Sequence, residues 1–303
     1  MPNFIAAIVV AYRPDLSVLE KLLISVRPQV DILILVDNGG AIAFQREFGD
    51  GLLLDRYIGL ESNLGLGYAL NAGFEVALQS GVKYVATFDQ DSAPHLTLIQ
   101  ELFEYQEKLE GSGVNCAAVS PVFFDRREES KTYFPFYFEK NGVIHSVTPN
   151  TCSDDVVEAD LLITSGMLVR IAAWSSVVRY DASLFVDYTD TEWCFRARAA
   201  GYRLFGCLKV EMGHAPSDAP PARVFGLSFF RYSPLRRYYY FRNTVRFCLA
   251  QYVSWPWKRR LMMGLALRFF VNLLIDESRL KSCKMMLLGV FHGLRGKTGE
   301  FIS

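Results

Sequence analysis

The stretch YVATFDQDS, residues 84–92, decides the fold and points to the chemistry. Its first five residues form a mostly apolar run, which predicts a strand buried on both faces of a parallel sheet. Asp89 and Asp91 follow where that strand ends, so they would face the crevice in which α/β proteins bind ligands. An Asp-x-Asp pair there suits a hard divalent cation that also touches substrate phosphates. A solvated turn, with Ser92 capping the next helix, is the alternative interpretation.

Strands and helices alternate on both sides of this stretch. Apolar runs predict strands at 4–12, 32–36, 55–59, 116–124, 161–169 and 209–214, and helical patterns occupy 14–26, 63–79, 94–109, the segment up to Gly201, and the chain from Ser233 onward. This order predicts an α/β protein with a mostly parallel sheet flanked by helices. Residues 125–160 are polar and aromatic, and they match neither pattern.

The composition is that of a folded protein from a reducing compartment. Hydrophobic residues make up 51% of the 303 residues, which is too many for a disordered chain. No two of the six cysteines have Cys-x-x-Cys spacing, so a zinc site or a disulfide framework is not expected. The apolar run at residues 4–12 follows no basic residue and stops at Arg13-Pro14, which argues against a signal peptide. We therefore expect a cytoplasmic protein.

The net charge of zero hides an uneven distribution. Residues 1–222 hold 17 Lys and Arg against 29 Asp and Glu, whereas residues 223–303 hold 15 Lys and Arg against three acidic residues. This predicts two parts, a catalytic domain over 1–222 and a basic helical region over 223–303. Because the basic region is also apolar and contains no nucleic-acid-binding motif, it fits an anionic membrane surface better than nucleic acid.

Two further features mark binding positions near the predicted sheet. Asp37 ends the strand at 32–36, so it could accept hydrogen bonds from a nucleobase or ribose, although it could equally cap the following turn. We favour binding, because Asp89 recurs in the same topological place. Gly65 and Gly67 lack the spacing of a dinucleotide-binding motif. At the start of a helix they would still let backbone approach a phosphate or a sugar.

An acidic cluster at 187–193 is a candidate site for a general base. Three carboxylates fall within six residues, beside apolar and aromatic neighbours that would tune their protonation. Favourable interaction with a helix dipole is the plainer explanation, and the two are compatible. Arg196 lies one helical turn after Glu192, which makes Glu192 the more structural residue and Asp190 the better base. His214 could complete a metal site with Asp91, or it could simply be exposed.

Taken together, seven short motifs resemble the inverting glycosyltransferases of family 2, which have the GT-A fold. These are VVAY at 9–12, VDN at 36–38, NLG at 63–65 with ALNAG at 69–73, FDQDS at 88–92, TSG at 164–166, FVDYTDTEW at 185–193, and RYYYFRN at 237–243. The resemblance covers about residues 4–250. Within the family, the sequence looks most like bacterial rhamnosyltransferases that build O-antigen or other surface polysaccharides.

The resemblance implies a role for each matched position. Asp190 would be the catalytic base, although Thr189 stands where many members have Glu, which keeps Asp187 in consideration. Asp91 would coordinate Mg²⁺ or Mn²⁺, and His214 would be a further metal or phosphate contact. The nucleotide sugar would be bound by Ala11, Tyr12, Asp37, Asn63, Gly65, Asp89, Gln90, Arg237 and Arg242. The acceptor side would be formed by Ser165, Gly166, Asp187, Glu192 and Trp193.

The same resemblance implies the partners. The donor would be dTDP-L-rhamnose, with UDP-galactofuranose, UDP-glucose and UDP-GlcNAc as alternatives, because no residue fixes the sugar. The acceptor would be a saccharide or a lipid-linked saccharide. A non-catalytic nucleotide-sugar-binding scaffold is the alternative of another class. It would require a damaged site, yet the sequence retains Asp37, Asp89, Asp91 and Asp190.

Residues 252–275 pattern as a helix rich in tryptophan, aliphatic and basic residues. Its longest uncharged apolar run, 261–267, is far too short to span a bilayer. An amphipathic helix lying on the membrane surface fits this composition. The alternatives are packing against the catalytic domain and packing against a second copy of the chain.

Overall fold

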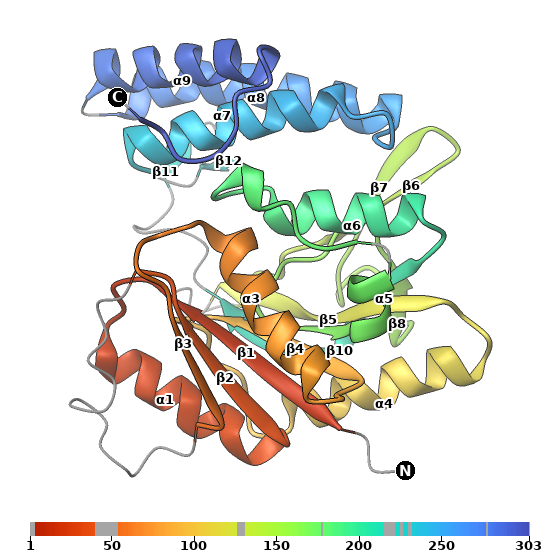
Figure 1. Ribbon diagram of the computed structural model, residues 1–303. Coiled ribbons are helices and arrows are strands. Elements are labelled where there is room, and N and C mark those ends of the chain that lie inside the picture. Colours follow the sequence, from red (N-terminus) through yellow and green to blue (C-terminus); the bar gives the residue numbers. More distant parts are fainter. Residues whose placement is uncertain are drawn as a thin grey trace.

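The computed structural model describes residues 4–39, 54–125, 131–176, 178–214, 222–224, 227–229, 232–276 and 278–302. Within the strands and helices, it does not describe the side chains of Ser176, His214, 222–224 and 227–229. A central sheet lies between two layers of helices, and the C-terminal helices cover one end of the molecule (Figure 1).

The sheet has eight strands in the order β3-β2-β1-β4-β9-β5-β10-β8. Their bounds are β1 Ile5–Ala11, β2 Ile32–Asp37, β3 Arg56–Gly59, β4 Tyr84–Asp89, β5 Cys116–Asp125, β8 Val156–Glu158, β9 Met167–Arg170 and β10 Arg203–His214. Strands β1 to β4 pair in parallel, as do β5 and β10, whereas β9 runs antiparallel between β4 and β5. The prediction of an α/β fold with a mostly parallel sheet is confirmed.

The register brings the predicted binding residues to one edge. Asp37 pairs with Ala11, and Asp89 pairs with Val10. Because β2 and β4 lie on opposite sides of β1, the chain changes direction across the sheet here. Open α/β sheets bind ligands outside the carboxyl ends of the strands at such a position.

Helices cover both faces of the sheet because alternate residues of each strand point to opposite sides. Ala6, Ile8 and Val10 pack with α3, whereas Ile5, Ala7 and Val9 pack with α1 and α4. The flanking helices are α1 Leu16–Val26, η1 Arg27–Gln29, α3 Leu66–Gln79, α4 Leu98–Gly111, α5 Ile171–Ser176, η3 Ala182–Leu184 and α6 Thr189–Ala199. All seven residues of β1 are buried, as expected for a strand covered on both faces.

Some element bounds differ from the predictions. The polar stretch 125–160 contains a hairpin of β6 Phe136–Lys140 and β7 Val143–Val147, followed by β8. The strand predicted at 161–169 begins only at Met167, because Gly166 adopts a φ of 73° that ends extended structure. Strand β10 starts at Arg203, six residues earlier than predicted. A short hairpin, β11 Ala222–Val224 and β12 Leu227–Phe229, precedes the C-terminal helices.

The C-terminal helices are α7 Pro234–Leu249, α8 Trp255–Ile275 and α9 Arg279–Leu294, and they lie beyond α6 (Figure 1). Phe247, Val253 and Trp257 share an apolar cluster with Phe195 of α6. Trp257 also donates to the Asp160 carboxylate at 2.6 Å. The predicted catalytic and basic regions are therefore joined by a common core. Among the described residues, no helix combines the length and hydropathy needed to cross a membrane.

Candidate active site

The carboxyl ends of β1 and β4 are tied together at the edge of the sheet. The Gln90 side chain accepts a hydrogen bond from the backbone amide of Tyr12 at 2.6 Å. Ala11 is fully buried, whereas 39% of Tyr12 is exposed at the rim. The structure therefore gives Gln90 a role in fixing the position of the backbone at 11–12, where the nucleotide is predicted to bind.

Three carboxylates gather at this edge, and two of them disfavour the charged form of Asp89. Burial, with the nearby Asp91 and Asp190 carboxylates, raises the pKa of Asp89 to about 7, and the positive charge of Arg236 opposes that rise. Burial likewise raises the pKa of Asp190, which accepts hydrogen bonds from the Thr191 amide at 2.7 Å and the Thr164 amide at 3.3 Å. Asp91 is exposed in the turn after β4. The arrangement suits binding of a cation and acceptance of a proton.

Arg236 is a functional candidate that the sequence did not reveal. Its guanidinium Nε lies 3.4 Å from the Asp187 carboxylate, and its positive charge opposes the rise in the pKa of Asp89. It lies in the first turn of α7, one position before Arg237, which the sequence motif singled out. The only signal was an adjacent pair of arginines, and which one faces the carboxylates depends on how α7 packs.

Arg237 and Arg242 point into the protein instead. Arg237 is 4% exposed and pairs with Asp276 at 2.5 Å. Arg242 is fully buried and donates to the carbonyls of Leu184 at 2.7 Å and Gly299 at 2.6 Å. The predicted contact of these two arginines with a diphosphate does not fit their places in this structure, because their donors are directed to protein groups.

Two predicted acceptor-side residues are also interior. Trp193 is fully buried and donates to the Val178 carbonyl at 2.5 Å. Glu192 is 5% exposed, forms an ion pair with Arg196, and accepts a hydrogen bond from the Tyr252 hydroxyl at 2.8 Å. The ion pair agrees with the structural role predicted for Glu192 from its helical spacing to Arg196, and neither Glu192 nor Trp193 is placed to meet an acceptor.

Ser165 and Gly166 form hydrogen bonds with residues on both sides of the turn that carries Asp91. The Ser165 and Ser92 hydroxyls are 2.5 Å apart, and the Gly166 amide donates to the Thr87 carbonyl at 2.6 Å. At its φ of 73°, a side chain on Gly166 would be strained, and its Cβ would lie 3.0 Å from the sulfur of Met212. The segment 164–166 therefore fixes the turn that carries Asp91.

The predicted nucleobase position is framed by residues from two strands. Asp37 is fully buried, and the Tyr57 hydroxyl donates to its Oδ2 atom at 3.0 Å. Burial and this carboxylate raise the pKa of Tyr57 to about 12, so the hydroxyl keeps its proton. The side-chain oxygen of Asn63 accepts a hydrogen bond from the side-chain nitrogen of Asn38 at 3.0 Å. Tyr57 and Asn38 were not among the predicted site residues, because only pairing of β2 with β3 brings Tyr57 to Asp37.

Gly65 allows a close approach between protein segments. It has a φ of 90°, and a Cβ there would lie 2.5 Å from the Phe185 carbonyl oxygen. The amide of Leu66, at the start of α3, donates to that same oxygen at 2.7 Å. The start of α3, which the sequence predicted to approach a phosphate or a sugar, thus contacts the loop before Asp187.

His214 ends β10, where its backbone pairs with Asp125. Its side chain lies outside the described part of the structure, so its predicted metal contact stays a prediction.

The donor set at the edge fits a hard divalent cation. Asp89 and Asp91 offer carboxylate oxygens, the ligands that Mg²⁺ prefers. Burial, and after it repulsion from Asp91 and Asp190, raises the pKa of Asp89, and a cation would oppose that repulsion. Within the described ranges, no group of three or more His, Cys, Asp and Glu side chains is arranged to hold a metal. Asp89 and Asp91 are therefore the residues that would hold such an ion.

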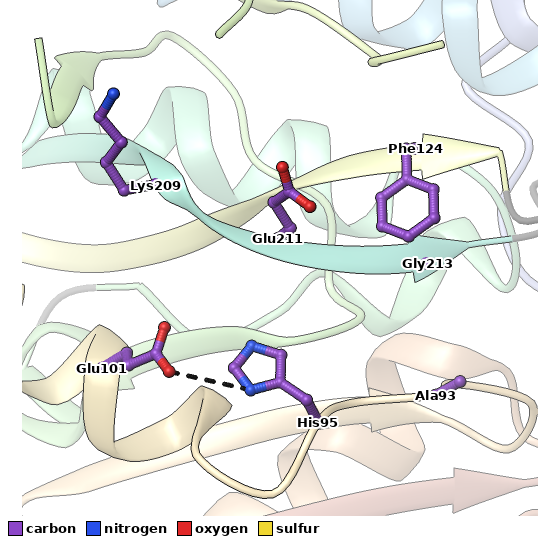
Figure 2. Close-up of a pocket in the computed structure, with 7 residues that line it drawn as sticks. All are labelled: Ala93, His95, Glu101, Phe124, Lys209, Glu211 and Gly213. Carbon is purple, nitrogen blue, oxygen red and sulfur yellow. Dashed lines mark ion pairs between the residues drawn. The ribbon is translucent and has the colours of Figure 1, made fainter. Parts of the chain in front are cut away.

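A separate hollow of about 400 Å³ opens between β10 and the loop before α4 (Figure 2). It is lined by Ala93, His95, Glu101, Phe124, Lys209, Glu211 and Gly213. His95 and Glu101 form an ion pair across 3.8 Å, and Glu211 pairs with Lys131. None of the predicted site residues lines this hollow, so we do not assign donor binding to it.

Comparisons with known proteins agree with this fold. Residues 6–155 match the family described as Glycosyl transferase family 2. The chain is 27% identical over 300 residues to dTDP-rhamnosyl transferase RfbF of Shigella flexneri, covering 99% of this chain and 98% of RfbF. Residues 1–349 of S. aureus TarS, solved with UDP-GlcNAc, superpose with a TM-score of 0.57 at 13% identity, covering 97% of this chain and 81% of that one. The chain spans 44% of the longer TarS structure, with a TM-score of 0.52.

The chain contains a glycosyltransferase family 2 domain, and its fold is GT-A. The protein is a glycosyltransferase. The family and fold predicted from the sequence motifs are thereby confirmed.

Proposed function

We propose that the protein is a metal-dependent inverting rhamnosyltransferase. It transfers L-rhamnose from dTDP-L-rhamnose to a saccharide or lipid-linked acceptor in bacterial surface-polysaccharide synthesis, which includes O-antigen. Similarity to RfbF over nearly the whole of both chains carries the choice of sugar, because it extends through the C-terminal helices as well as the catalytic domain. A UDP-sugar is the second candidate donor, since the TarS structure with a similar fold holds UDP-GlcNAc.

The mechanism follows from the charges at the sheet edge. Asp89 and Asp91 would hold Mg²⁺ or Mn²⁺, which when bound supplies positive charge to the departing diphosphate. Arg236, which pairs with Asp187 and acts electrostatically on Asp89, would add a second positive charge near the diphosphate. Asp190 would accept the proton of the acceptor hydroxyl while that oxygen attacks the anomeric carbon from the face opposite the diphosphate. Attack from that face inverts the anomeric centre.

Donor and metal are tested together on the purified full-length protein. With Mg²⁺ or Mn²⁺, we expect binding and turnover of dTDP-L-rhamnose in preference to UDP-glucose, UDP-galactofuranose and UDP-GlcNAc. Chelation by EDTA should abolish turnover, and Asp91→Asn should lower it by about 10²–10³-fold, because stabilisation of the leaving group is lost. Isothermal calorimetry and release of dTDP report binding and turnover.

Glu20→Gln, which removes an exposed carboxylate from α1, is the matched control and should behave as the native protein. Preference for a UDP-sugar would retain the mechanism and discard rhamnose. Folded protein that binds a donor but turns over none of them would instead favour the scaffold alternative.

The basic C-terminal helices offer an apolar surface that fits an anionic membrane. Met263, Leu267, Phe270 and Leu274 are spaced on one face of α8 and are 47–66% exposed. Helix α9 exposes Leu280, Leu287, Phe291 and Leu294 in the same way. The 15 Lys and Arg in residues 223–303 complement an anionic surface, whereas two copies of this face would repel each other. We propose that the protein binds the inner face of the cell membrane, where a lipid-linked acceptor would be available.

Vesicle binding tests this location. The triple variant Met263→Ser, Phe270→Ser and Leu274→Ser should weaken co-sedimentation with phosphatidylglycerol-containing vesicles at least tenfold, since burying each such side chain contributes roughly 1.5–3 kcal/mol. Leu96→Ser, which changes a side chain 67% exposed near α4, is the matched control. Unchanged vesicle binding by the triple variant would contradict the proposal. A fall in molecular mass on light scattering would assign the face to a homo-oligomer instead.

A further inference from the structure

The loop at residues 184–188 has an unusual backbone. It leads from η3 into α6, so it carries Asp187 and sets the position of Asp190. Phe185, Asp187 and Tyr188 have φ angles of 68°, 60° and 68°. Residues other than glycine rarely adopt this conformation, and it persists only where the surrounding contacts impose it.

The contacts that impose it come from distant segments. The Asn243 side-chain nitrogen lies 3.0 Å from the Leu184 carbonyl oxygen, 2.8 Å from that of Val186 and 3.0 Å from that of Asp187. The remaining carbonyl, of Phe185, accepts the amide of Leu66. Each carbonyl from 184 to 187 thus has a donor outside the loop, and one asparagine provides three of these contacts.

Arg242 orients that asparagine. Its Nε donates to the Asn243 side-chain oxygen at 2.9 Å, which leaves the amide nitrogen directed at the loop. Its two terminal nitrogens donate to the Leu184 and Gly299 carbonyls. The Gly299 amide in turn donates to the Ser183 carbonyl at 2.7 Å. Both side chains are fully buried, so they act on the loop and not on a ligand.

We infer that Arg242 and Asn243 are positioning residues for sugar transfer, because they hold the loop that places Asp187, Asp190 and, through Asp187, Arg236. The catalytic part of this inference rests on the proposed function. Its conformational part, that α7 holds the loop in shape, stands without it.

Asn243→Asp tests the inference with little change of volume. Aspartate keeps an oxygen acceptor for Arg242 but presents an oxygen in place of the donor to three carbonyls. We expect kcat to fall about 100-fold, as a misplaced reacting group causes, while the donor Kd changes by less than about threefold, since ground-state binding is largely kept. Backbone amides at 184–192 should exchange with deuterium faster than in the native protein. Arg242→Lys, which loses the forked guanidinium donor, should likewise lower kcat and speed amide exchange at 184–192. It serves as the test variant if Asn243→Asp does not fold.

Met286→Ala is the control for a purely structural effect. Met286 is fully buried in the cluster that joins α7, α8 and α9, so its loss should lower the unfolding temperature while kcat and loop exchange stay native. Loss of stability in Asn243→Asp with native kcat and native exchange would overturn the inference. If the protein transfers no sugar tested, the exchange measurement alone decides whether α7 holds the loop, which separates this failure from failure of the proposed function.

Discussion

Asp190→Asn is expected to lower kcat by about 10²–10⁴-fold with little change in donor Kd, because it removes the proposed general base and keeps the side-chain shape. Burial raises the pKa of Asp190. As the pH is lowered, the activity of the native enzyme should therefore begin to fall at a higher pH than it would if the base were an aspartate with an ordinary pKa. That acidic limb should disappear from the profile of the variant. Stopped-time assays of transfer across pH, with binding measured separately, check both effects.

Asp187→Asn is the matched comparison for this prediction. Asp187 pairs with Arg236 at 3.4 Å, so it is held by a cation, whereas Asp190 accepts hydrogen bonds from backbone amides. The Asp187 variant should retain more activity than the Asp190 variant. The reverse order would assign the base to Asp187.

Asp89→Asn should abolish transfer and yet stabilise the metal-free protein at pH 8. The pKa of Asp89 is about 7 in the folded protein against a reference value of 3.8. Because the folded state holds this proton more tightly, native stability falls as pH rises from about 4 to 7. A shift of this size corresponds to about 4 kcal/mol. Partial solvent access reduces the expected gain in unfolding free energy to roughly 1–3 kcal/mol.

Urea unfolding in EDTA at pH 4 and pH 8 measures this gain. The native protein and the Asp89 variant should be nearly equal at pH 4 and differ at pH 8, whereas Glu20→Gln should match the native protein at both. Adding Mg²⁺ with dTDP-sugar should stabilise the native protein by mass action and leave the variant unchanged. An equal difference at the two pH values would refute the explanation through the Asp89 proton.

The sheet was predictable because its signals are local. An apolar run buried on both faces identifies β4 whatever lies around it, and the alternation of strands and helices fixes the class of fold. The acidic positions could be predicted equally well from the sequence, since Asp37 and Asp89 directly follow such runs. Their meeting at one edge follows from parallel pairing alone.

The rest of the site depends on packing between distant segments. Arg236 and Arg237 are neighbours in sequence, and only the docking of α7 turns one toward Asp187 and the other toward Asp276. Likewise, Asn243 reaches carbonyls 56–59 residues away. No spacing rule links such partners, so the RYYYFRN motif predicted ligand contacts where the structure shows internal support.

The hydrogen bonds from Gly299 and Arg242 to the segment 183–184 also bear on the order in which the protein matures. A chain made from its N-terminus completes β1, β2 and β4 long before α7 and residue 299 leave the ribosome. The nucleotide edge can then form in the nascent chain, while the loop that leads to Asp190 still lacks the donors that shape it. Competence to bind a donor would thus precede competence to use it, and the half-made enzyme would not spend activated sugar.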